Sequence, residues 1–376
     1  MTTRAAWTWP TLHDGQRAVL LDMLIHGDMS RAELARRTGM SRGSLTRLSR
    51  DLTALDLVEE GETDAPLGRG RPAERLRLRP EAAQFVGFKL TGEALYAAVT
   101  DLTGAVLVTE EHPLESRAVE DVIELMGQVV DRQRETYERV AAVGVCLAGD
   151  VRQRRGMTEM VSSYFLGWGK VPIERLIRDR TGLPIAVAND VQALAAAHHW
   201  FGAGRGHRSM VLIGLGAGIG VGAVVNDELL QGSRGRAGKI GHLPVECSGP
   251  TCDRGHAGCV SAFVTIPAIT RAAGTDSLDA TFEAARSGDR RAHEALVAAA
   301  RGLGAVGAYL INMFDPEKVI ITGEGRAVAE YIPAELQDSL RSRLDPDAKP
   351  LQFDVQPFQF SDYAWAAAIS AIQRLV

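Results

Sequence analysis

Three of the four cysteines in this 376-residue chain are close neighbours, at Cys247, Cys252 and Cys259. Thiolates bind soft metal ions, and cysteines crowded into one short segment indicate a local metal or thiol cluster rather than a disulfide framework. His242 stands just before the cluster and could add an imidazole nitrogen. We therefore expect either a metal-ligating loop or a loop of reduced thiols over about 242–259.

A second chemically active segment is cationic. Residues 69–79 contain five arginines and one glutamate, a composition that attracts phosphate groups. Two short helices are predicted just before it. Ser30 and Glu33 form a capping box that starts a helix through residue 37, and residues 38–40 break that helix. Ser41 then caps a helix over about 42–55, because leucines repeat there at helical spacing, at Leu45, Leu48, Leu52 and Leu55.

Two helices joined by a three-residue turn that contains glycine have the spacing of a helix-turn-helix, whose second helix enters the major groove of DNA. An earlier amphipathic run over residues 19–25 predicts the third helix that such a small domain needs for a core. At the start of the second helix, the residues expected to contact bases are Ser41, Arg42, Ser44, Thr46 and Arg47.

The cationic segment ends in alternating charged and apolar residues, which predicts a strand and therefore a wing beside the helix-turn-helix. Arg69 and Arg71 flank a glycine at its tip and could enter a narrow minor groove, and Arg75 could contact phosphate. A basic hairpin can also be a solvated linker. Its attachment to a helix-turn-helix favours DNA binding.

Composition is that of an ordinary globular protein, 45% hydrophobic and 24% charged, with a net charge of −5. Before residue 80 there are thirteen arginines and eleven acidic residues, a net charge of +2, and the remainder carries −7. A basic head on an acidic body fits DNA contact by the head alone. We expect no membrane-spanning segment and no secretion signal, and hence a cytoplasmic protein.

The pattern changes after residue 84 to that of an α/β domain. Strands are predicted over 85–90, 95–101 and 106–111, then a helix over about 120–138 and a strand over 141–147, which indicates a mixed sheet. A second half from about residue 191 holds strands at 210–215 and 318–322 and helices at 292–314 and 363–375. Its glycine series fits either a tight hairpin or a backbone that approaches phosphates or sugars closely, at Gly214, Gly216, Gly218, Gly220 and Gly222.

Four motifs followed by the cysteine cluster resemble the ROK family of repressors, sugar kinases and uncharacterised reading frames. They are Leu166-Gly167-Trp168, Val187-Ala188-Asn189-Asp190, Leu215-Gly216-Ala217-Gly218-Ile219-Gly220 and Ala237-Gly238-Lys239-Ile240-Gly241-His242. The resemblance covers nearly the whole chain, and the N-terminal segment is similar to that of the repressor branch. It implies a winged helix-turn-helix over 1–80 and a two-lobed actin-like (ribonuclease H-like) domain over 81–376. Its lobes would be about 81–190 plus the C-terminal helix and about 191–360, with a sugar in the cleft.

The same resemblance argues against catalysis. Family kinases present an Asp and a Gly-Gly-Thr that hold metal and nucleotide phosphates, whereas this chain has Lys89 at the Asp position and Glu93 beyond it. Glu93 would repel phosphate, and no ligand for Mg²⁺ takes the place of the Asp. We expect no enzyme activity and no ATP binding, with a sugar kinase that keeps a DNA-binding head as the alternative. Asp190, the base in the kinases, would orient a ligand or cap the helix that starts at residue 191.

In the family's sugar site, the resemblance assigns effector positions to Phe165, Asn189, Asp190, Lys239, His242 and Ser261. Two carboxylates and an amide of the family pattern are replaced, and Lys239 adds a positive charge. One hypothesis is an anionic ligand, such as a sugar phosphate or sugar acid, neutralised by Lys239. A second is that Lys239 pairs with Asp190 and fills the cleft, so that no ligand binds. A neutral sugar is the third.

The resemblance also implies a structural zinc ion on His242, Cys252 and Cys259, although Arg254 replaces one family cysteine. Structural zinc takes four nitrogen or sulfur ligands, so the fourth must come from elsewhere, with Cys247 preferred and His256 as second choice. Taken together, we predict a DNA-binding regulator, a repressor, that binds a palindromic double-stranded operator as a homodimer or tetramer. An effector, a sugar or sugar derivative, would change operator affinity by favouring one conformation. A ligand-independent regulator is the alternative.

Overall fold

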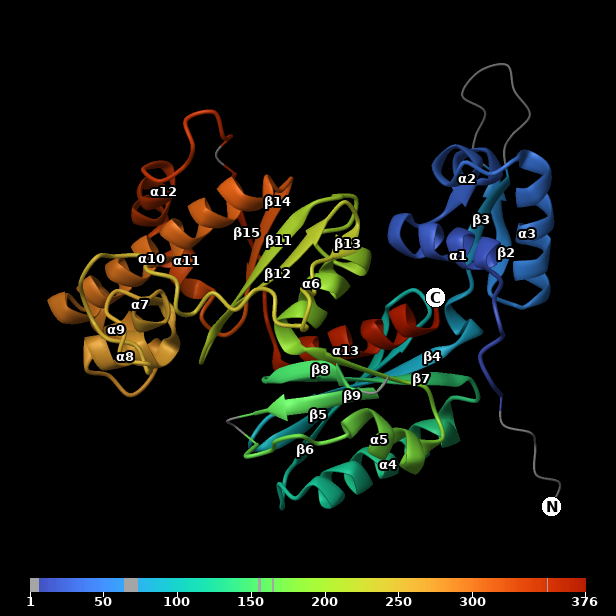
Figure 1. Cartoon of the computed structure of the whole chain (residues 1–376), viewed down its shortest axis with the longest axis horizontal. Coiled ribbons are helices and arrows are strands. Elements are labelled where there is room, and N and C mark those ends of the chain that lie inside the picture. Colours follow the sequence, from blue (N-terminus) through green and yellow to red (C-terminus); the bar gives the residue numbers. More distant parts are fainter. Residues whose placement is uncertain (1–6, 64–73, 155–156, 164–165, 350) are drawn as a thin grey trace. The chain divides into compact units, whose positions relative to one another are not determined.

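A computed structural model describes residues 7–63, 74–154, 157–163, 166–349 and 351–376. Its internal contacts divide the chain into two compact units (Figure 1). Unit 1 comprises Met1–Ala193, Trp200–Gly206 and Phe360–Val376, and unit 2 comprises Leu194–His199 and His207–Gln359. The N-terminal residues 7–79, here called the head, belong to unit 1.

The head consists of three helices and a small antiparallel sheet. Its helices are α1 (Asp14–His26), α2 (Arg31–Thr38) and α3 (Arg42–Ala54), and its strands are β1 (Met29–Ser30), β2 (Val58–Thr63) and β3 (Glu74–Leu78), in the order β1-β3-β2. The helices predicted over 30–37 and 42–55 are thus confirmed to within a residue or so. The tip between β2 and β3, which includes Arg69 and Arg71, lies outside the described residues.

Local sequence explains where α2 begins and ends. The Ser30 hydroxyl accepts a hydrogen bond from the Glu33 amide at 3.2 Å, and the Glu33 carboxylate accepts one from the Ser30 amide at 2.8 Å, which completes the capping box. Gly39 ends α2 in the left-handed conformation, with φ of 69°. Fully buried leucines from all three helices and β3 then form the core of the head: Leu20, Leu24, Leu34, Leu45, Leu52 and Leu76.

The rest of unit 1 is a mixed five-stranded sheet with the order β10-β7-β4-β5-β6. Strands β4 (Gln84–Leu90), β5 (Ala94–Asp101) and β6 (Val106–Pro113) are antiparallel, whereas β7 (Val140–Leu147) and β10 (Ile185–Asn189) run parallel to β4. Helix α4 (Val119–Thr136) connects β6 to β7, and the hairpin of β8 (Asp150–Arg154) and β9 (Met157–Ser162) and helix α5 (Ile173–Thr181) precede β10. The predicted mixed sheet is therefore confirmed.

Helix α13 (Phe360–Leu375) packs directly on this sheet, although it comes from the end of the chain. A Cβ atom on Gly87 of β4 would lie 2.0 Å from the Ala364 carbonyl oxygen, and one on Gly144 of β7 would lie 1.7 Å from that of Ala367. Only glycine allows so close an approach of strand and helix backbones. Alanine-rich α13 and the two glycines thus bring the helix into backbone contact with the central strands (Figure 1).

Unit 2 repeats the strand plan of unit 1. Its sheet has the order β13-β12-β11-β14-β15, with β11 (Met210–Leu215), β12 (Ile219–Val225) and β13 (Glu228–Leu229) antiparallel. Strands β14 (Lys318–Thr322) and β15 (Phe353–Val355) run parallel to β11. The glycine series forms the β11–β12 hairpin, in which the Gly216 amide donates to the Gly218 carbonyl at 2.9 Å. Of the two interpretations that the sequence allows, the structure contains the tight hairpin.

Among the described residues, the helices that lie wholly in unit 2 are α7 (Ser261–Val264), α8 (Ile266–Ala273), α9 (Leu278–Arg286), α10 (Arg290–Phe314), α11 (Ala327–Tyr331) and α12 (Pro333–Arg341). Only α10 was predicted from the sequence. By length and composition α10 could cross a membrane, contrary to expectation, but 67% of its most apolar window is buried inside the fold. Helix α10 is therefore a core helix that packs against α8, α9 and α12.

Candidate functional site

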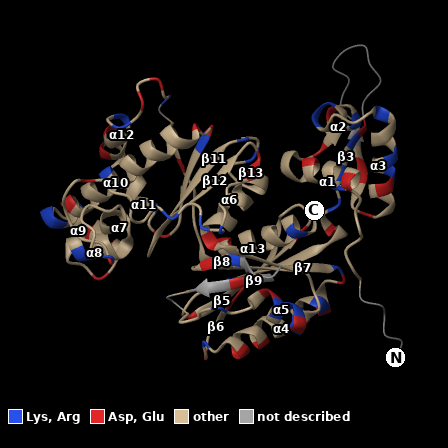
Figure 2. Ribbon diagram, viewed as in Figure 1, with Lys and Arg blue, Asp and Glu red and all other residues tan. Residues whose placement is uncertain are grey.

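Helix α3 presents a cationic face. Leu45 and Leu52 are buried, while Arg42, Arg47 and Arg50 are exposed. Figure 2 shows basic residues along α3. Among the described residues, none of these three guanidinium groups forms a hydrogen bond or an ion pair. Arg50 was not predicted as a contact, although its position one turn beyond Arg47 places it on the same face. This face can therefore offer three uncommitted cations to a polyanion.

The other predicted residues at the start of α3 lie beside this face. Ser41 caps α3 by accepting the Ser44 amide at 3.2 Å, and the two hydroxyls are 3.0 Å apart. Thr46 donates its hydroxyl to the Arg42 carbonyl at 2.9 Å. All three hydroxyls keep lone pairs that can accept further hydrogen bonds. The structure thus brings together the five residues predicted for base contact at one end of α3.

The arginines of β3 are used differently. Arg75 donates to the Asp28 carbonyl at 2.5 Å, because β1–β3 pairing places it opposite Ser30. Arg77 pairs with Glu59 at 2.5 Å, and Arg79 pairs with Asp56 and Glu81. The expected phosphate contact of Arg75 therefore competes with an internal hydrogen bond. The three arginines of residues 74–79 therefore form contacts that stabilise the fold of the head.

Arg31, at the first position of α2, connects the wing strands to α3. Its guanidinium donates to Ser49 Oγ of α3 at 3.1 Å, to Glu60 of β2 at 2.5 Å and to Glu74 of β3 at 3.3 Å. The guanidinium fork suits such multiple acceptors. No role of its own was predicted for Arg31, because its partners are up to 43 residues away. Arg31 fixes the strands relative to the helix proposed to contact bases.

Asn189 and Asp190 lie where β10 ends and α6 (Asp190–Phe201) begins. The Asn189 side chain accepts the amides of Val191 and Gln192 at 3.1 and 3.4 Å, and donates to the Gly149 carbonyl at 3.3 Å. Asp190 Oδ1 also accepts the Val191 amide, at 2.9 Å. Both side chains therefore cap α6, as the helix-capping interpretation of Asp190 predicted.

The second carboxylate oxygen of Asp190 is bound to a lysine. Lys89 Nζ lies 2.7 Å from Asp190 Oδ2 and 4.3 Å from the centre of the Tyr363 ring, and both charged residues are buried. The sequence hypothesis paired Asp190 with Lys239, whereas the partner in the structure is Lys89. The cation thus occupies the position where the resemblance to family kinases implies an acid. A carboxylate neutralised in this way is a poor general base.

Two further residues bear on the comparison with the family's kinases, Cys146 and Glu93. Burial raises the pKa of the Cys146 thiol to about 12, and that thiol donates to the Tyr363 carbonyl at 3.0 Å. Glu93 is exposed in the β4–β5 turn, where the Thr91 hydroxyl accepts its amide at 3.2 Å. Glu93 is the one carboxylate of residues 91–93, all of which are described, and its side chain is exposed. An ion pair of Lys89 with Asp190 thus stands at the two positions that the resemblance to the family's kinases assigns to an acid and a base.

The remaining predicted effector residues lie in unit 2, except Phe165, which is outside the described residues. Lys239 and His242 follow Gly238, whose carbonyl accepts the Val221 amide of β12 at 3.0 Å. Partial burial lowers the pKa of Lys239. The Ser261 hydroxyl is buried and has no hydrogen-bond partner among the described residues. A buried hydroxyl without a partner is a candidate ligand contact, because leaving it unpaired is unfavourable.

The loop after β13 brings together two cysteines and two histidines. One ligand atom from each of His242, Cys252, His256 and Cys259 lies within 4.8 Å of the others. Cys252 Sγ is 3.4 Å from His242 Nδ1. Desolvation opposes ionisation of Cys252, but backbone hydrogen bonds near Arg254 and His256 outweigh it and lower its pKa. Two sulfur and two nitrogen donors are a set that zinc prefers.

The fourth member of this group is His256 rather than Cys247, the preferred choice from the sequence. A tight turn explains the difference: the Cys252 amide donates to the His256 carbonyl at 2.9 Å, and Thr251 pairs with Ala257. The turn brings the His256 ring to 5.6 Å from the His242 ring. Cys247 is exposed and is not in the group.

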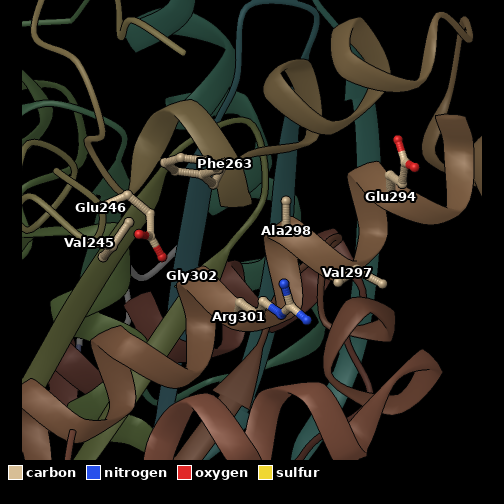
Figure 3. A pocket seen from close by; sticks show the side chains of 8 residues that line it. All are labelled: Val245, Glu246, Phe263, Glu294, Val297, Ala298, Arg301 and Gly302. Atoms are coloured by element: carbon tan, nitrogen blue, oxygen red, sulfur yellow. The ribbon is translucent and has the colours of Figure 1, made fainter. Parts of the chain in front are cut away.

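A hollow of about 330 Å³ on unit 2 has none of the predicted effector residues in its lining (Figure 3). Its lining mixes apolar side chains with charged ones: Val245, Glu246, Phe263, Glu294, Val297, Ala298, Arg301 and Gly302. Arg301 is already paired with Glu335 at 2.8 Å. The hollow lacks the dense set of polar donors and acceptors that a sugar requires.

The chain is similar to known proteins in both sequence and fold. The model of the ROK family matches residues 85–372. The chain is 24% identical over 375 residues to the DNA-binding transcriptional repressor Mlc of Escherichia coli, covering 94% of this chain and 91% of that protein. It is 23% identical over 368 residues to the xylose repressor of Bacillus spizizenii, covering 95% and 94%.

Solved structures agree with these matches. A ROK family transcriptional regulator, described as a homologue of E. coli Mlc, superposes with a TM-score of 0.81 at 26% identity and covers 96% of each chain. A ROK hexokinase from Thermus thermophilus superposes with a TM-score of 0.67 at 28% identity and covers 77% of this chain and 97% of its own. The regulator thus matches a larger share of this chain than the kinase does. On the match of its residues 85–372, the chain belongs to the ROK family.

Proposed function

We propose that this protein is a DNA-binding transcriptional regulator of the ROK family that acts as a repressor and not as an enzyme. The observation that carries the proposal is the face of α3, where Arg42, Arg47 and Arg50 are exposed without partners among the described residues. The head would be a winged helix-turn-helix domain over about residues 1–80, with α3 in the major groove. The partner of the head would be double-stranded DNA, and the protein would act in the cytoplasm.

One recognition helix contacts only a few base pairs, so specificity requires at least two heads on one operator. We therefore propose a homodimer or a tetramer bound to a palindromic site. Residues 81–376 would form the actin-like effector and oligomerisation domain. Arg31 supports DNA binding by the head, because it holds β2 and β3 in a fixed position beside α3.

The proposed effector is a sugar or a sugar derivative. The residues assigned to it are Asn189, Asp190, Lys239, His242 and Ser261, and the buried Ser261 hydroxyl supports a polar ligand. Since Lys89 already neutralises Asp190, we propose that Asp190 acts as an oriented hydrogen-bond acceptor. The relative named as a xylose repressor is consistent with this class of effector.

The test is a pull-down of genomic fragments with the purified protein, followed by footprinting of the best fragment at fixed salt. Footprints are then repeated with D-xylose, N-acetylglucosamine, glucose 6-phosphate and gluconate. We expect a palindromic footprint that one of these compounds releases. Release by the two anions alone would identify an anionic effector. Absence of any footprint would refute the DNA-binding proposal.

A second candidate is a regulator that needs no effector, and the buried Lys89–Asp190 ion pair favours it. In that protein Lys89 would permanently occupy the acceptor that a ligand uses elsewhere in the family. Thermal unfolding against the same four compounds separates the candidates, because a ligand that binds the native state raises the melting temperature. An unchanged footprint together with unchanged melting would favour the ligand-independent regulator.

We also propose that His242, Cys252, His256 and Cys259 hold a structural zinc ion. Tetrahedral zinc with bonds of about 2.0–2.3 Å requires ligand atoms about 3.5 Å apart, which the observed 4.8 Å limit allows after small side-chain rotations. The reduced thiols needed for binding are available in the cytoplasm. The ion would brace the loop that carries His242.

A further inference from the structure

Helix α6 connects two regions that the proposed function treats separately. It starts at Asp190, next to Asn189, and ends at Phe201. The turn that follows it, through Gly206, belongs to unit 1, as do Asp190 and the head. Asn189, Asp190 and the head are therefore parts of one compact unit, and α6, whose middle residues Leu194–His199 belong to unit 2, runs from Asp190 to the turn that ends at Gly206.

The start of α6 is fixed by the proposed effector residues. Asn189 ties it to the Gly149 carbonyl at 3.3 Å, and Asp190 ties it to Lys89 at 2.7 Å. These contacts are made by side chains that also cap the helix. A ligand that bonded to either side chain would alter the anchoring of α6 directly.

The turn after α6 contacts the head. Arg205 Nε donates to the carbonyl of Ile25, in the last turn of α1, at 3.3 Å. Gly27, just beyond α1, has φ of 84°, and a Cβ atom there would lie 2.4 Å from the guanidinium nitrogen Nη2 of Arg205. Gly27 thus leaves room for the guanidinium to lie against the end of α1.

The surrounding junction is loosely filled. Phe201 packs on the β5–β6 turn, where a Cβ atom on Gly104 would lie 2.7 Å from its ring. Next to it is a hollow of about 420 Å³ lined by residues of the head and of the rest of unit 1: Leu24, His26, Gly27, Asp28, Leu78, Thr103, Phe201 and Arg205. Specific contacts such as that of Arg205, rather than continuous packing, hold the head at this point.

We infer that α6 transmits the state of Asn189 and Asp190 to the DNA-binding head through Arg205. A helix is a stiff element, so a change at its first turn shifts its last turn as well. Arg205 would then move the end of α1, and with it the position of α3. The inference rests on the proposed function, since it identifies how an effector at Asn189 and Asp190 would regulate DNA binding.

A double-mutant cycle tests this link without requiring the effector. Operator affinity is measured for the wild type, Asp190→Asn, Arg205→Ala and the double variant. We expect Asp190→Asn to change operator Kd by about tenfold in the otherwise wild-type protein. In the Arg205→Ala background the same substitution should change Kd by less than about twofold. Equal changes in both backgrounds, or no change in either, would overturn the inference.

Another head–body contact provides the matched control. Arg139 pairs with Asp56 of the head at 2.6 Å and is not part of α6. Arg139→Ala should leave the effect of Asp190→Asn intact. If Asp190→Asn fails to fold, as judged by circular dichroism, Asn189→Ser perturbs the same helix start in its place.

Hydrogen exchange without DNA separates failure of this inference from failure of the proposed function. Amides of residues 25–28 should exchange faster in Asp190→Asn than in the wild type, and the difference should vanish in the Arg205→Ala background. If this pattern is found in a protein that binds no DNA, the link stands and the proposed function fails. If DNA binding is found without the pattern, the link fails.

Discussion

Lys89 Nζ lies 2.7 Å from Asp190 Oδ2, in a buried pair that joins strand β4 to the first residue of α6. The resemblance to the family's kinases places at Lys89 the acid that holds metal and nucleotide phosphates. Here a single lysine both removes that acid and neutralises the would-be base. One lysine therefore changes both positions that the resemblance assigns to phosphoryl transfer.

Replacing Lys89 should destabilise the protein strongly. Lys89→Met leaves Asp190 buried without its cation, and breaking a buried pair in this way costs about 3–5 kcal/mol. Urea denaturation gives the free energy of unfolding. As a control, Arg290 pairs with Glu294 on the surface at 3.3 Å, and Arg290→Ala should cost less than about 1 kcal/mol. Similar decreases in the free energy of unfolding of both variants would show that the buried ion pair contributes no more stability than the surface pair.

Arg50 of α3 should contact DNA phosphate, whereas Arg77 of β3 should not. Removing one arginine–phosphate ion pair lowers the slope of log affinity against log salt by about 0.9. Fluorescence anisotropy with a labelled operator at several salt concentrations should show this decrease for Arg50→Ala and an unchanged slope for Arg77→Ala, since Arg77 is paired with Glu59. A decrease for Arg77→Ala alone would contradict the assignment.

Two variants distinguish the candidates for the fourth zinc ligand, His256 and Cys247. His256→Ala should contain no bound zinc, measured by elemental analysis of protein purified without chelators, and its melting temperature should no longer respond to a chelator. Cys247→Ser should retain both zinc and the response, because Cys247 is outside the ligand group. Absence of zinc from Cys247→Ser but not from His256→Ala would reverse this assignment.

Stability should fall on acidification because of His198. Burial lowers its pKa from 6.5 to about 4, so below about pH 6.5 the unfolded chain binds a proton that the native protein does not. The stability associated with neutral His198 is complete above pH 6.5 and is lost between about 6.5 and about 4, up to about 3 kcal/mol. Urea denaturation across this range should show a smaller decline for His198→Gln. An identical decline would exclude His198 as the cause.

Local patterns in the sequence predicted much of the fold. The helix over 42–55 was found at Arg42–Ala54, because Ser41 and the leucine repeat define both its start and its buried face. The strands around Gly87 and the long helix α10 were also found close to their predicted positions. The β8–β9 hairpin and helices α5, α8, α9, α11 and α12 were not predicted, since they are short and owe their stability to packing on the larger elements.

The candidate site was harder to predict because its contacts join distant residues. Lys89 was identified as a departure from the kinase pattern, but its partner Asp190 is 101 residues away, and Lys239 had been paired with it instead. Likewise, His256 enters the metal group through a turn whose hydrogen bonds depend on the folded loop. Arg75 has a cationic side chain in the predicted place, yet its hydrogen bond to Asp28 depends on strand register.

The close packing of α13 on Gly87 and Gly144 has a consequence for the synthesis of this protein. Strands β4, β5, β7 and β10 leave the ribosome long before α13, because the residues of unit 2 lie between them and α13 in the sequence. Until then one face of their sheet lacks its covering helix and exposes apolar surface that can aggregate. The nascent chain must therefore keep this half-built layer soluble while all of unit 2 is made.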